Sequence, residues 1–179
     1  MSILTVQTDG SCMPNPGDMG IGIVIYKGNK RERCSCQVDL NPKTNMIRGS
    51  RDCQECMGTG YIENRRVKKT ISQFIGYGTN NEVEYIAFIR GLEEVKKIKR
   101  PEDQIRIYVD SLLVYKQTRG EWKVNKQELK PLCERAKELI EGIGDIEVIW
   151  MDREKNTGAD ILAKSAILSE RIIKEEKEC

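Results

Sequence analysis

Residues 3–11 have the sequence Ile3-Leu4-Thr5-Val6-Gln7-Thr8-Asp9-Gly10-Ser11, and this stretch decides the fold. Apolar and polar side chains alternate along it as in a β-strand, with Asp9 on the more polar face. Gly10-Ser11 breaks the strand directly after the acid, and residues 14–17, Pro-Asn-Pro-Gly, predict a tight turn. Taken alone, an acid at a strand end is more often a turn residue that bonds its own backbone.

Length and composition indicate a single folded domain, residues 1–179, with room for a modest insertion. Hydrophobic residues make up 39% of the chain, which is enough for a core, and the net charge of +2 gives no strong global field. No apolar run approaches the roughly 20 residues of a membrane span, and the N-terminus is a strand rather than a signal peptide. We therefore expect a cytoplasmic monomer that does not enter a membrane.

Histidine is absent from the chain, and cysteine occurs seven times. The absence of histidine excludes imidazole chemistry and leaves carboxylates, thiolates and lysines for catalysis or metal binding. In a cytoplasmic protein the cysteines favour metal ligands or free thiols over a disulfide framework.

The pattern of apolar residues predicts an α/β fold. Strands are expected at 3–9, 19–26, 67–75, 105–109 and 146–151, and helices between Asn81 and Pro101, from Ser111, over 129–140 and from Gly158. An antiparallel meander of three strands thus leads into alternating strands and helices. This order indicates a five-stranded mixed sheet, three strands antiparallel and then two parallel, flanked by helices.

Residues 31–66 differ in character from the rest and are interpreted as an insertion between the second and third strands. They hold four of the seven cysteines, many arginines and few large apolar residues. The clips Cys34-Ser35-Cys36 and Cys53-Gln54-Glu55-Cys56 predict one tetrahedral Zn²⁺ bound by Cys34, Cys36, Cys53 and Cys56. Residues 53–60 also resemble one C-x-x-C-x-G-x-G repeat of the zinc-binding region of J-domain chaperones. The alternatives are reduced surface thiols or a redox dithiol at Cys53 and Cys56.

Four acidic residues occupy comparable places in the predicted elements. Asp9 and Asp110 end strands, and Glu84 and Asp160 lie in the first turns of helices. In an open sheet with parallel strands such positions gather at one end, where ligand sites form. Each acid also has a local explanation: a capping box of Asn81 with Glu84, a favourable helix N-terminus for Asp160, and turns for the other two. Because clustered carboxylates repel unless cations neutralise them, the set favours Mg²⁺ or Mn²⁺.

Four motifs, in this order, resemble those of type 1 ribonuclease H. They are Asp9-Gly10-Ser11, residues 79–85 (Thr-Asn-Asn-Glu-Val-Glu-Tyr), Asp110-Ser111 and residues 153–163 (Arg-Glu-Lys-Asn-Thr-Gly-Ala-Asp-Ile-Leu-Ala). Residues 120–124 and 128–132 are similar to the family's segment after the fourth strand. The resemblance covers the chain except the insertion, and it implies a ribonuclease H-like sheet.

The resemblance implies an endonuclease that hydrolyses the RNA strand of RNA–DNA hybrids with two ions of Mg²⁺ or Mn²⁺. It assigns Asp9 to both ions and Asp160 to the ion that activates water. Glu84 and Asp110 would hold the ion at the leaving oxygen.

Contacts with the hybrid are implied as well. Asn15, Asn80 and Asn81 match positions that contact the minor groove, and Thr79 matches part of a pocket for a DNA-strand phosphate. The chain departs from some members in having no histidine before the last acid and a short segment at 120–124. Because the sequence opens on the first strand, we also expect no separate hybrid-binding domain ahead of it. These departures bear on the strength of hybrid binding and remove no metal ligand.

Two other functions are compatible with the sequence. A nucleic-acid-binding module of the same fold would use the zinc insertion for recognition, and a thiol-redox or chaperone-type module would centre on Cys53 and Cys56.

Because the second strand runs away from the carboxylates, the insertion is expected roughly 20–25 Å from the metal site. There it would serve stability, or contact a protein partner or a flanking stretch of nucleic acid.

Overall fold

The computed structural model describes residues 2–33, 39–40, 47–48 and 61–178 of the chain. The elements are β1 (Ile3–Met13), β2 (Gly17–Arg33), β3 (Asp39–Leu40), β4 (Ile47–Arg48), β5 (Tyr61–Gly78), α1 (Asn80–Ile98), β6 (Gln104–Val109), α2 (Leu112–Thr118), α3 (Lys130–Ile143), β7 (Ile146–Trp150) and α4 (Thr157–Glu178). Short 3-10 turns at Gln127–Leu129 (η1) and Arg153–Lys155 (η2) precede α3 and α4. The order of the main strands and helices is the one that the sequence predicted.

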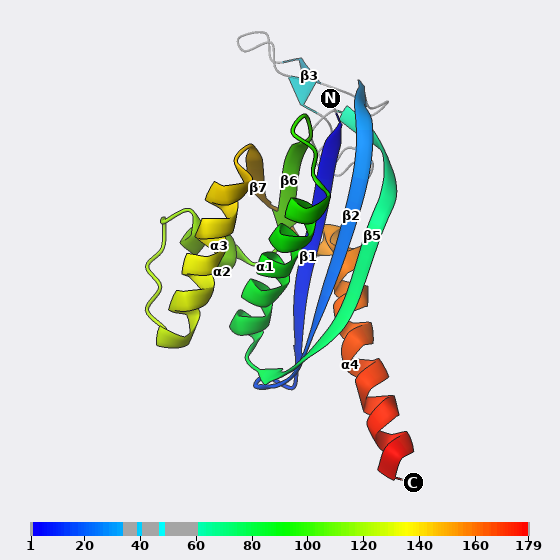
Figure 1. The fold of residues 1–179 in the computed structure, drawn as a ribbon, viewed down its shortest axis with the longest axis vertical. Helices are drawn as coiled ribbons and strands as arrows, with labels where there is room; N and C mark the ends of the chain where they lie inside the picture. The colour runs from blue at the N-terminus through cyan, green and yellow to red at the C-terminus, as the bar shows by residue number, and fades with distance from the viewer. Residues whose placement is uncertain (1, 34–38, 41–46, 49–60, 179) are drawn as a thin grey trace.

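Five strands form one mixed sheet in the order β5-β2-β1-β6-β7. β2 pairs antiparallel with β1 and β5, whereas β6 pairs parallel with β1 and β7. Helices α1, α2 and α3 lie on one side of this sheet and α4 lies on the other (Figure 1). Covered from both sides, the central strand β1 is buried at every residue from Ile3 to Ser11. The predicted mixed sheet flanked by helices is therefore confirmed.

Helix α1 lies against β1 through a face of buried apolar side chains that recur at helical spacing. Its start is fixed by a capping box, in which the Thr79 side chain accepts a hydrogen bond from the Glu82 backbone and the Thr79 backbone donates to the Glu82 carboxylate. The sequence had suggested a box between Asn81 and Glu84, and that interpretation is wrong by two residues. Glu84 is thus not part of the cap.

Two glycines let the helix backbones rest directly on the sheet. A Cβ atom on Gly10 would lie 2.6 Å from the carbonyl carbon of Val83 in α1. One on Gly22 would lie 1.9 Å from the carbonyl oxygen of Ala159 in α4. Real Cβ atoms do not come this close to backbone atoms, so both positions require glycine. Since Gly22 pairs with Asp9 across the β1–β2 ladder, both helices meet the sheet near the same point of β1.

Strands β2 and β5 are longer than the sequence predicted. Their pairing continues through Arg31–Glu63 and Glu32–Ile62 to Arg33–Tyr61, so both ends of the predicted insertion, 31–33 and 61–66, belong to the hairpin. The apolar alternation that marks a strand is absent there, and pairing through the backbone does not need it. Arg33 lies eleven residues beyond Gly22 along β2, or about 36 Å along the strand, which is farther than the sequence predicted.

The predicted zinc ligands cannot be placed in this fold. Cys34, Cys36, Cys53 and Cys56 lie outside the described residues. Between them only the short antiparallel pair of β3 and β4 is described. The zinc site and the limits of the insertion as a unit therefore stay predictions.

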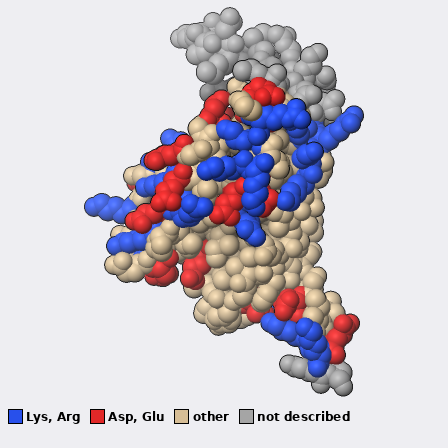
Figure 2. Space-filling view, viewed as in Figure 1, with Lys and Arg blue, Asp and Glu red and all other residues tan. Residues whose placement is uncertain are grey.

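Charged side chains of both signs lie over α1 and α3 on the face seen in Figure 2. Glu94 of α1 pairs with Lys69 of β5 at 2.5 Å and with Lys97 at 2.7 Å. Arg135 of α3 pairs with Glu93 of α1 at 3.3 Å. Ion pairs of this kind reduce the electrostatic field at this surface, which agrees with the small net charge of +2. Within the described part of the chain, none of the helices combines the length and apolar character that a membrane crossing requires.

Replacing Gly22 by alanine should destabilise the protein by about 1–3 kcal/mol, because the added methyl group forces α4 away from β2. Denaturant unfolding followed by circular dichroism would measure the loss. Gly142→Ala is the matched control: its added Cβ meets the flexible end of the Lys96 side chain at 3.2 Å, and alanine favours a helix over glycine. Equal stability of the two variants would contradict this account of how α4 packs.

Candidate metal centre

Asp9 lies within β1 and not at its end. The strand continues to Met13 in antiparallel pairing with β2, whereas its parallel pairing with β6 stops one residue before Asp9. Asp9 and Asp110 are therefore the first residues beyond the β1–β6 pairing, where the sheet opens between the two strands. The predicted break at Gly10-Ser11 is wrong, because β2 supplies a partner for β1 on its other edge.

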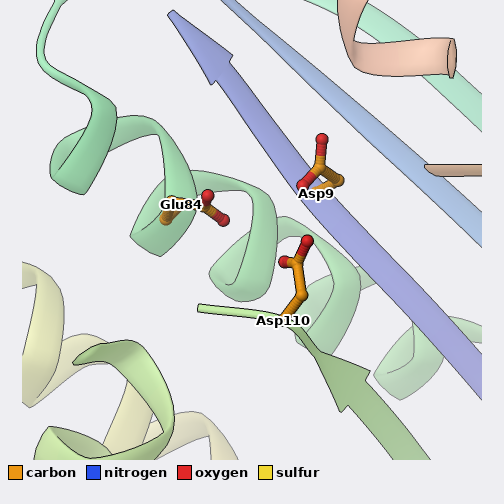
Figure 3. Close-up of side chains that lie close together, drawn as sticks. All are labelled: Asp9, Glu84 and Asp110. Atoms are coloured by element: carbon orange, nitrogen blue, oxygen red, sulfur yellow. The ribbon is translucent and has the colours of Figure 1, made fainter. Parts of the chain in front are cut away.

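Three carboxylates meet at this opening. One oxygen from each of Asp9, Glu84 and Asp110 lies within 4.8 Å of the other two. Figure 3 shows the three side chains around a shared space, coming from β1, from α1 and from the residue that follows β6. Glu84 reaches this space because the backbone of α1 rests on Gly10 beside it. Asp9 is fully buried, and the other two acids are partly exposed.

Asp160 lies beside this triad and is held in another way. It sits in the first turn of α4, as the sequence predicted. Its carboxylate contacts Lys164 Nζ at 2.6 Å, one helical turn further on, and Arg153 Nη2 at 3.6 Å. The structure thus brings Asp9, Glu84 and Asp110 together and leaves Asp160 next to them in ion pairs.

Burial and mutual repulsion disfavour the charged forms of the acids. Loss of solvent, together with the charges of Asp110 and Asp160, raises the pKa of Asp9 to about 8. Burial, followed by the charges of Asp9 and Asp110, raises the pKa of Glu84 well above its ordinary value. Burial lowers the pKa of Arg153, but the four carboxylates raise it by more. Arg153 is therefore close enough to act electrostatically on the whole cluster.

Several carboxylate oxygens are buried without a hydrogen-bond partner. Within the described part of the chain, both oxygens of Asp9 and one oxygen each of Asp110 and Asp160 are in this state. A buried carboxylate that accepts no hydrogen bond is costly unless a cation takes the place of water. Oxygen donors of this kind suit hard divalent cations such as Mg²⁺ and Mn²⁺. The residues present therefore fit the metal ions that the sequence predicted.

Asn156 is a buried residue of the site that the sequence analysis did not single out. Its Nδ2 donates to the Thr8 carbonyl oxygen at 2.8 Å, and the Asp160 backbone N–H donates to its carbonyl oxygen at 3.1 Å. It therefore joins β1 beside Asp9 to the start of α4. Its place directly before a helix was a usable signal, because asparagine is favoured there. Arg153 and Lys164 were missed too, since basic residues on helix surfaces are common.

The four predicted substrate-binding residues lie together at the β1–β2 turn and the start of α1. Thr79 is the N-cap residue, Asn80 and Asn81 open the helix, and the Asn80 backbone N–H donates to Asn15 Oδ1 at 3.1 Å. All four are at least partly exposed. Asn81 lies about one helical turn before Glu84, so this surface leads toward the acids. Contact of these residues with nucleic acid stays a prediction.

The reverse transcriptase-like family matches residues 63–166 of the chain. The bifunctional protein Rv2228c of Mycobacterium tuberculosis is 27% identical over 164 residues, which cover 92% of this chain and 35% of that protein. The chain thus spans about a third of the length of the first curated relatives that it matches.

Solved structures resemble nearly the whole chain. RNase H1 from the halophilic archaeon Halobacterium salinarum matches with a TM-score of 0.67 and 26% identity, over 93% of this chain and 98% of that one. LC11-RNase H1, solved in complex with an RNA/DNA hybrid, matches with a TM-score of 0.63, 26% identity and the same coverage. These likenesses confirm the ribonuclease H-like fold. Because the matched residues 63–166 make up more than half of the sequence and include Glu84, Asp110 and Asp160, the chain belongs to the reverse transcriptase-like family.

Proposed function

We propose that this protein is a metal-dependent endonuclease that hydrolyses the RNA strand of RNA–DNA hybrids. The observation that carries the proposal is the triad of Asp9, Glu84 and Asp110 in a ribonuclease H-like sheet. Asp9 and Asp110 have buried oxygens that accept no hydrogen bond within the described part of the chain. The likeness to RNase H1 structures, one of them in complex with an RNA/DNA hybrid, supports it. The assembled triad also argues against a module that only binds nucleic acid.

Metal ligation would divide the acids into two overlapping sets. Asp9, Glu84 and Asp110 would hold one divalent cation, and Asp9 with Asp160 would hold a second. Two such ions supply positive charge to the attacking and leaving oxygens of an in-line displacement. The chain contributes fixed positions: Asp9 is immobilised in the central strand, and Glu84 is set by the helix that rests on Gly10. Burial of Asp9 keeps water away and strengthens electrostatic interactions around it.

The proposed path of the hybrid leads over the start of α1. The amides of Asn15, Asn80 and Asn81 can both donate and accept hydrogen bonds, as recognition of 2′-hydroxyls and base edges in a shallow minor groove requires. The Thr79 hydroxyl already donates to the Glu82 carboxylate at 2.7 Å. A DNA-strand phosphate bound at Thr79 would therefore have to take over this hydrogen bond from Glu82.

Asp9→Asn should abolish cleavage, by more than about a hundredfold, while the protein stays folded, because both cations lose a shared charged ligand. The assay compares matched RNA–DNA hybrid, duplex RNA and duplex DNA with Mg²⁺ or Mn²⁺, and only the hybrid should be cut efficiently. Asp145→Asn, at an exposed acid between α3 and β7, is the control and should cleave like the wild type. Activity of Asp9→Asn within tenfold of the wild type would reject the role of Asp9, and equal cutting of duplex DNA would reject the substrate.

Without metal, the contribution of Asp9 to stability should fall as the pH rises. Folding raises the pKa of Asp9 from 3.8 to about 8, so that between these values the folded state holds a proton that the unfolded state releases. This contribution is complete below about pH 4 and is lost as the pH approaches 8. Asp9→Asn should therefore gain stability over the wild type from near pH 5 to near pH 8, measured by urea unfolding in a chelator. A stability difference that is constant over this range would contradict the raised pKa.

We also propose that Cys34, Cys36, Cys53 and Cys56 bind one structural Zn²⁺, and that the insertion they belong to contacts a protein or flanking nucleic acid. The support is the spacing of the two cysteine clips. The Arg33–Tyr61 pair adds to it, because it holds the two chain ends that lead into the cysteine segment side by side.

Protein purified without chelator should contain about one zinc ion per chain by elemental analysis. A variant in which Asn-Gly replaces residues 34–60 should contain none and should cleave a short hybrid within about tenfold of the wild type, since such a turn closes a hairpin between paired residues. Zinc near zero in the wild type would reject the site. A folded but inactive deletion variant would show that the insertion takes part in cleavage.

A further inference from the structure

Within the described part of the chain, Asp160 differs from Asp9, Glu84 and Asp110 in having basic side chains at contact distance. Lys164 Nζ lies 2.6 Å from one carboxylate oxygen and Arg153 Nη2 lies 3.6 Å from the other. Asp9, Glu84 and Asp110 have their ligand oxygens within 4.8 Å of one another already. The three proposed ligands of one cation, Asp9, Glu84 and Asp110, are therefore already close together. Asp160, a proposed ligand of the other cation, is instead paired with basic side chains.

We propose that Lys164 and Arg153 compete with a divalent cation for Asp160, so that the two metal positions fill in a fixed order. The triad of Asp9, Glu84 and Asp110 takes the first ion, and the position shared by Asp9 and Asp160 fills second and more weakly. This inference rests on the proposed function, because it takes these carboxylates to be the metal ligands.

Lys164 is the stronger competitor. It lies on the same helix as Asp160, at the spacing at which an acid and a following lysine attract each other. The side chain of Asp160 is 18% exposed and that of Lys164 is 46% exposed, so water screens the pair in part. The competition should therefore change the affinity of the second ion by a few-fold and should not block the site.

Arg153 acts over a wider range. Its guanidinium lies at η2, is permanently charged, and interacts with all four carboxylates. In the metal-free protein it replaces part of the positive charge that the ions would bring. Its side chain is 62% exposed, which leaves room for it to move outward when a cation arrives.

Binding of Mn²⁺ to the full chain tests the competition directly, by calorimetry and by electron paramagnetic resonance of the free ion. Lys164→Met should lower the Kd of the more weakly bound Mn²⁺ by about threefold to tenfold, or should bind a second Mn²⁺ where the wild type binds one. The Kd of the more tightly bound Mn²⁺ should stay within about twofold of the wild-type value. Lys164→Arg should bind like the wild type, because it keeps the charge.

Lys174→Met is the matched control, since it removes the same charge from the same helix. Lys174 pairs with Glu170 at 4.0 Å, at the same spacing as Lys164 with Asp160, and lies over the Phe74 ring, so that its partners are not the acids of the metal centre. It should bind Mn²⁺ like the wild type. In an Asp160→Asn background Lys164→Met should change nothing, because the ligand under competition has gone.

Thermal unfolding gives a readout independent of cleavage. In a chelator Lys164→Met should have a lower Tm than the wild type, because Asp160 has lost the nearer of its two basic partners, and Mn²⁺ should raise the Tm of this variant by more than that of the wild type. Identical Mn²⁺ isotherms for Lys164→Met and Lys174→Met, or an undiminished effect of Lys164→Met in the Asp160→Asn background, would overturn the inference and leave the proposed function standing. A wild type and variants that all bind no Mn²⁺ would reject the metal centre and both proposals with it.

Discussion

Direct contact between backbones holds the acids of this protein in place. Gly10 allows α1 to rest on β1, and Gly22, opposite Asp9, allows α4 to rest on β2. Glu84 and Asp160 stand on these two helices, so their distance from Asp9 depends on contacts that involve no side chain. Metal–ligand distances tolerate deviations of only about 0.2 Å. Gly10 and Gly22, which carry no functional group, therefore set the positions of Glu84 and Asp160 relative to Asp9.

Folding brings together carboxylates whose negative charges repel one another and whose burial is unfavourable. Asp9 lies fully buried in the central strand, and neither of its oxygens accepts a hydrogen bond within the described part of the chain. The core of the same domain is filled by large side chains such as Tyr85 and Phe88 on α1, both fully buried. Their packing offsets the unfavourable burial of the acid and keeps the carboxylates near one another. Without a cation, the folded chain relieves this repulsion by holding a proton on Asp9, whereas acids on an open surface would simply move apart.

The element order and the convergence of Asp9, Glu84 and Asp110 followed from the sequence, because apolar periodicity and acids near element ends are local signals. What the sequence did not reveal depends on partners distant in the chain. Asp9 lies within its strand because β2 pairs with β1 on the far edge, which no pattern inside residues 3–11 records. The capping box was misplaced because the run from Thr79 to Glu84 offers two polar–acidic pairs at the same spacing, and tertiary packing chooses between them.

Side-chain ion pairs were equally beyond reach of the sequence. The separation of Asp160 from the triad depends on where the ends of Lys164 and Arg153 lie, and a basic residue near a predicted ligand does not specify this. The second strand was predicted to end at Tyr26, and the change of composition at residue 31 was interpreted as the start of an insertion. Backbone pairing continues to Arg33 nevertheless, since a ladder does not require apolar side chains.

The long β2–β5 ladder affects how this chain tolerates change. Its last pair, Arg33 and Tyr61, holds two backbone segments about 5 Å apart, so the ends of the segment that joins them are fixed relative to each other. The free-energy cost of closing a flexible loop, which is entropic, rises by only about 0.6 kcal/mol for each doubling of the loop's length. Segments of very different size can therefore be exchanged at this point with little thermodynamic effect on the distant sheet. Substitutions or an inserted domain at this end of the hairpin should therefore leave the pairing of β1 and β2 around Asp9 unchanged.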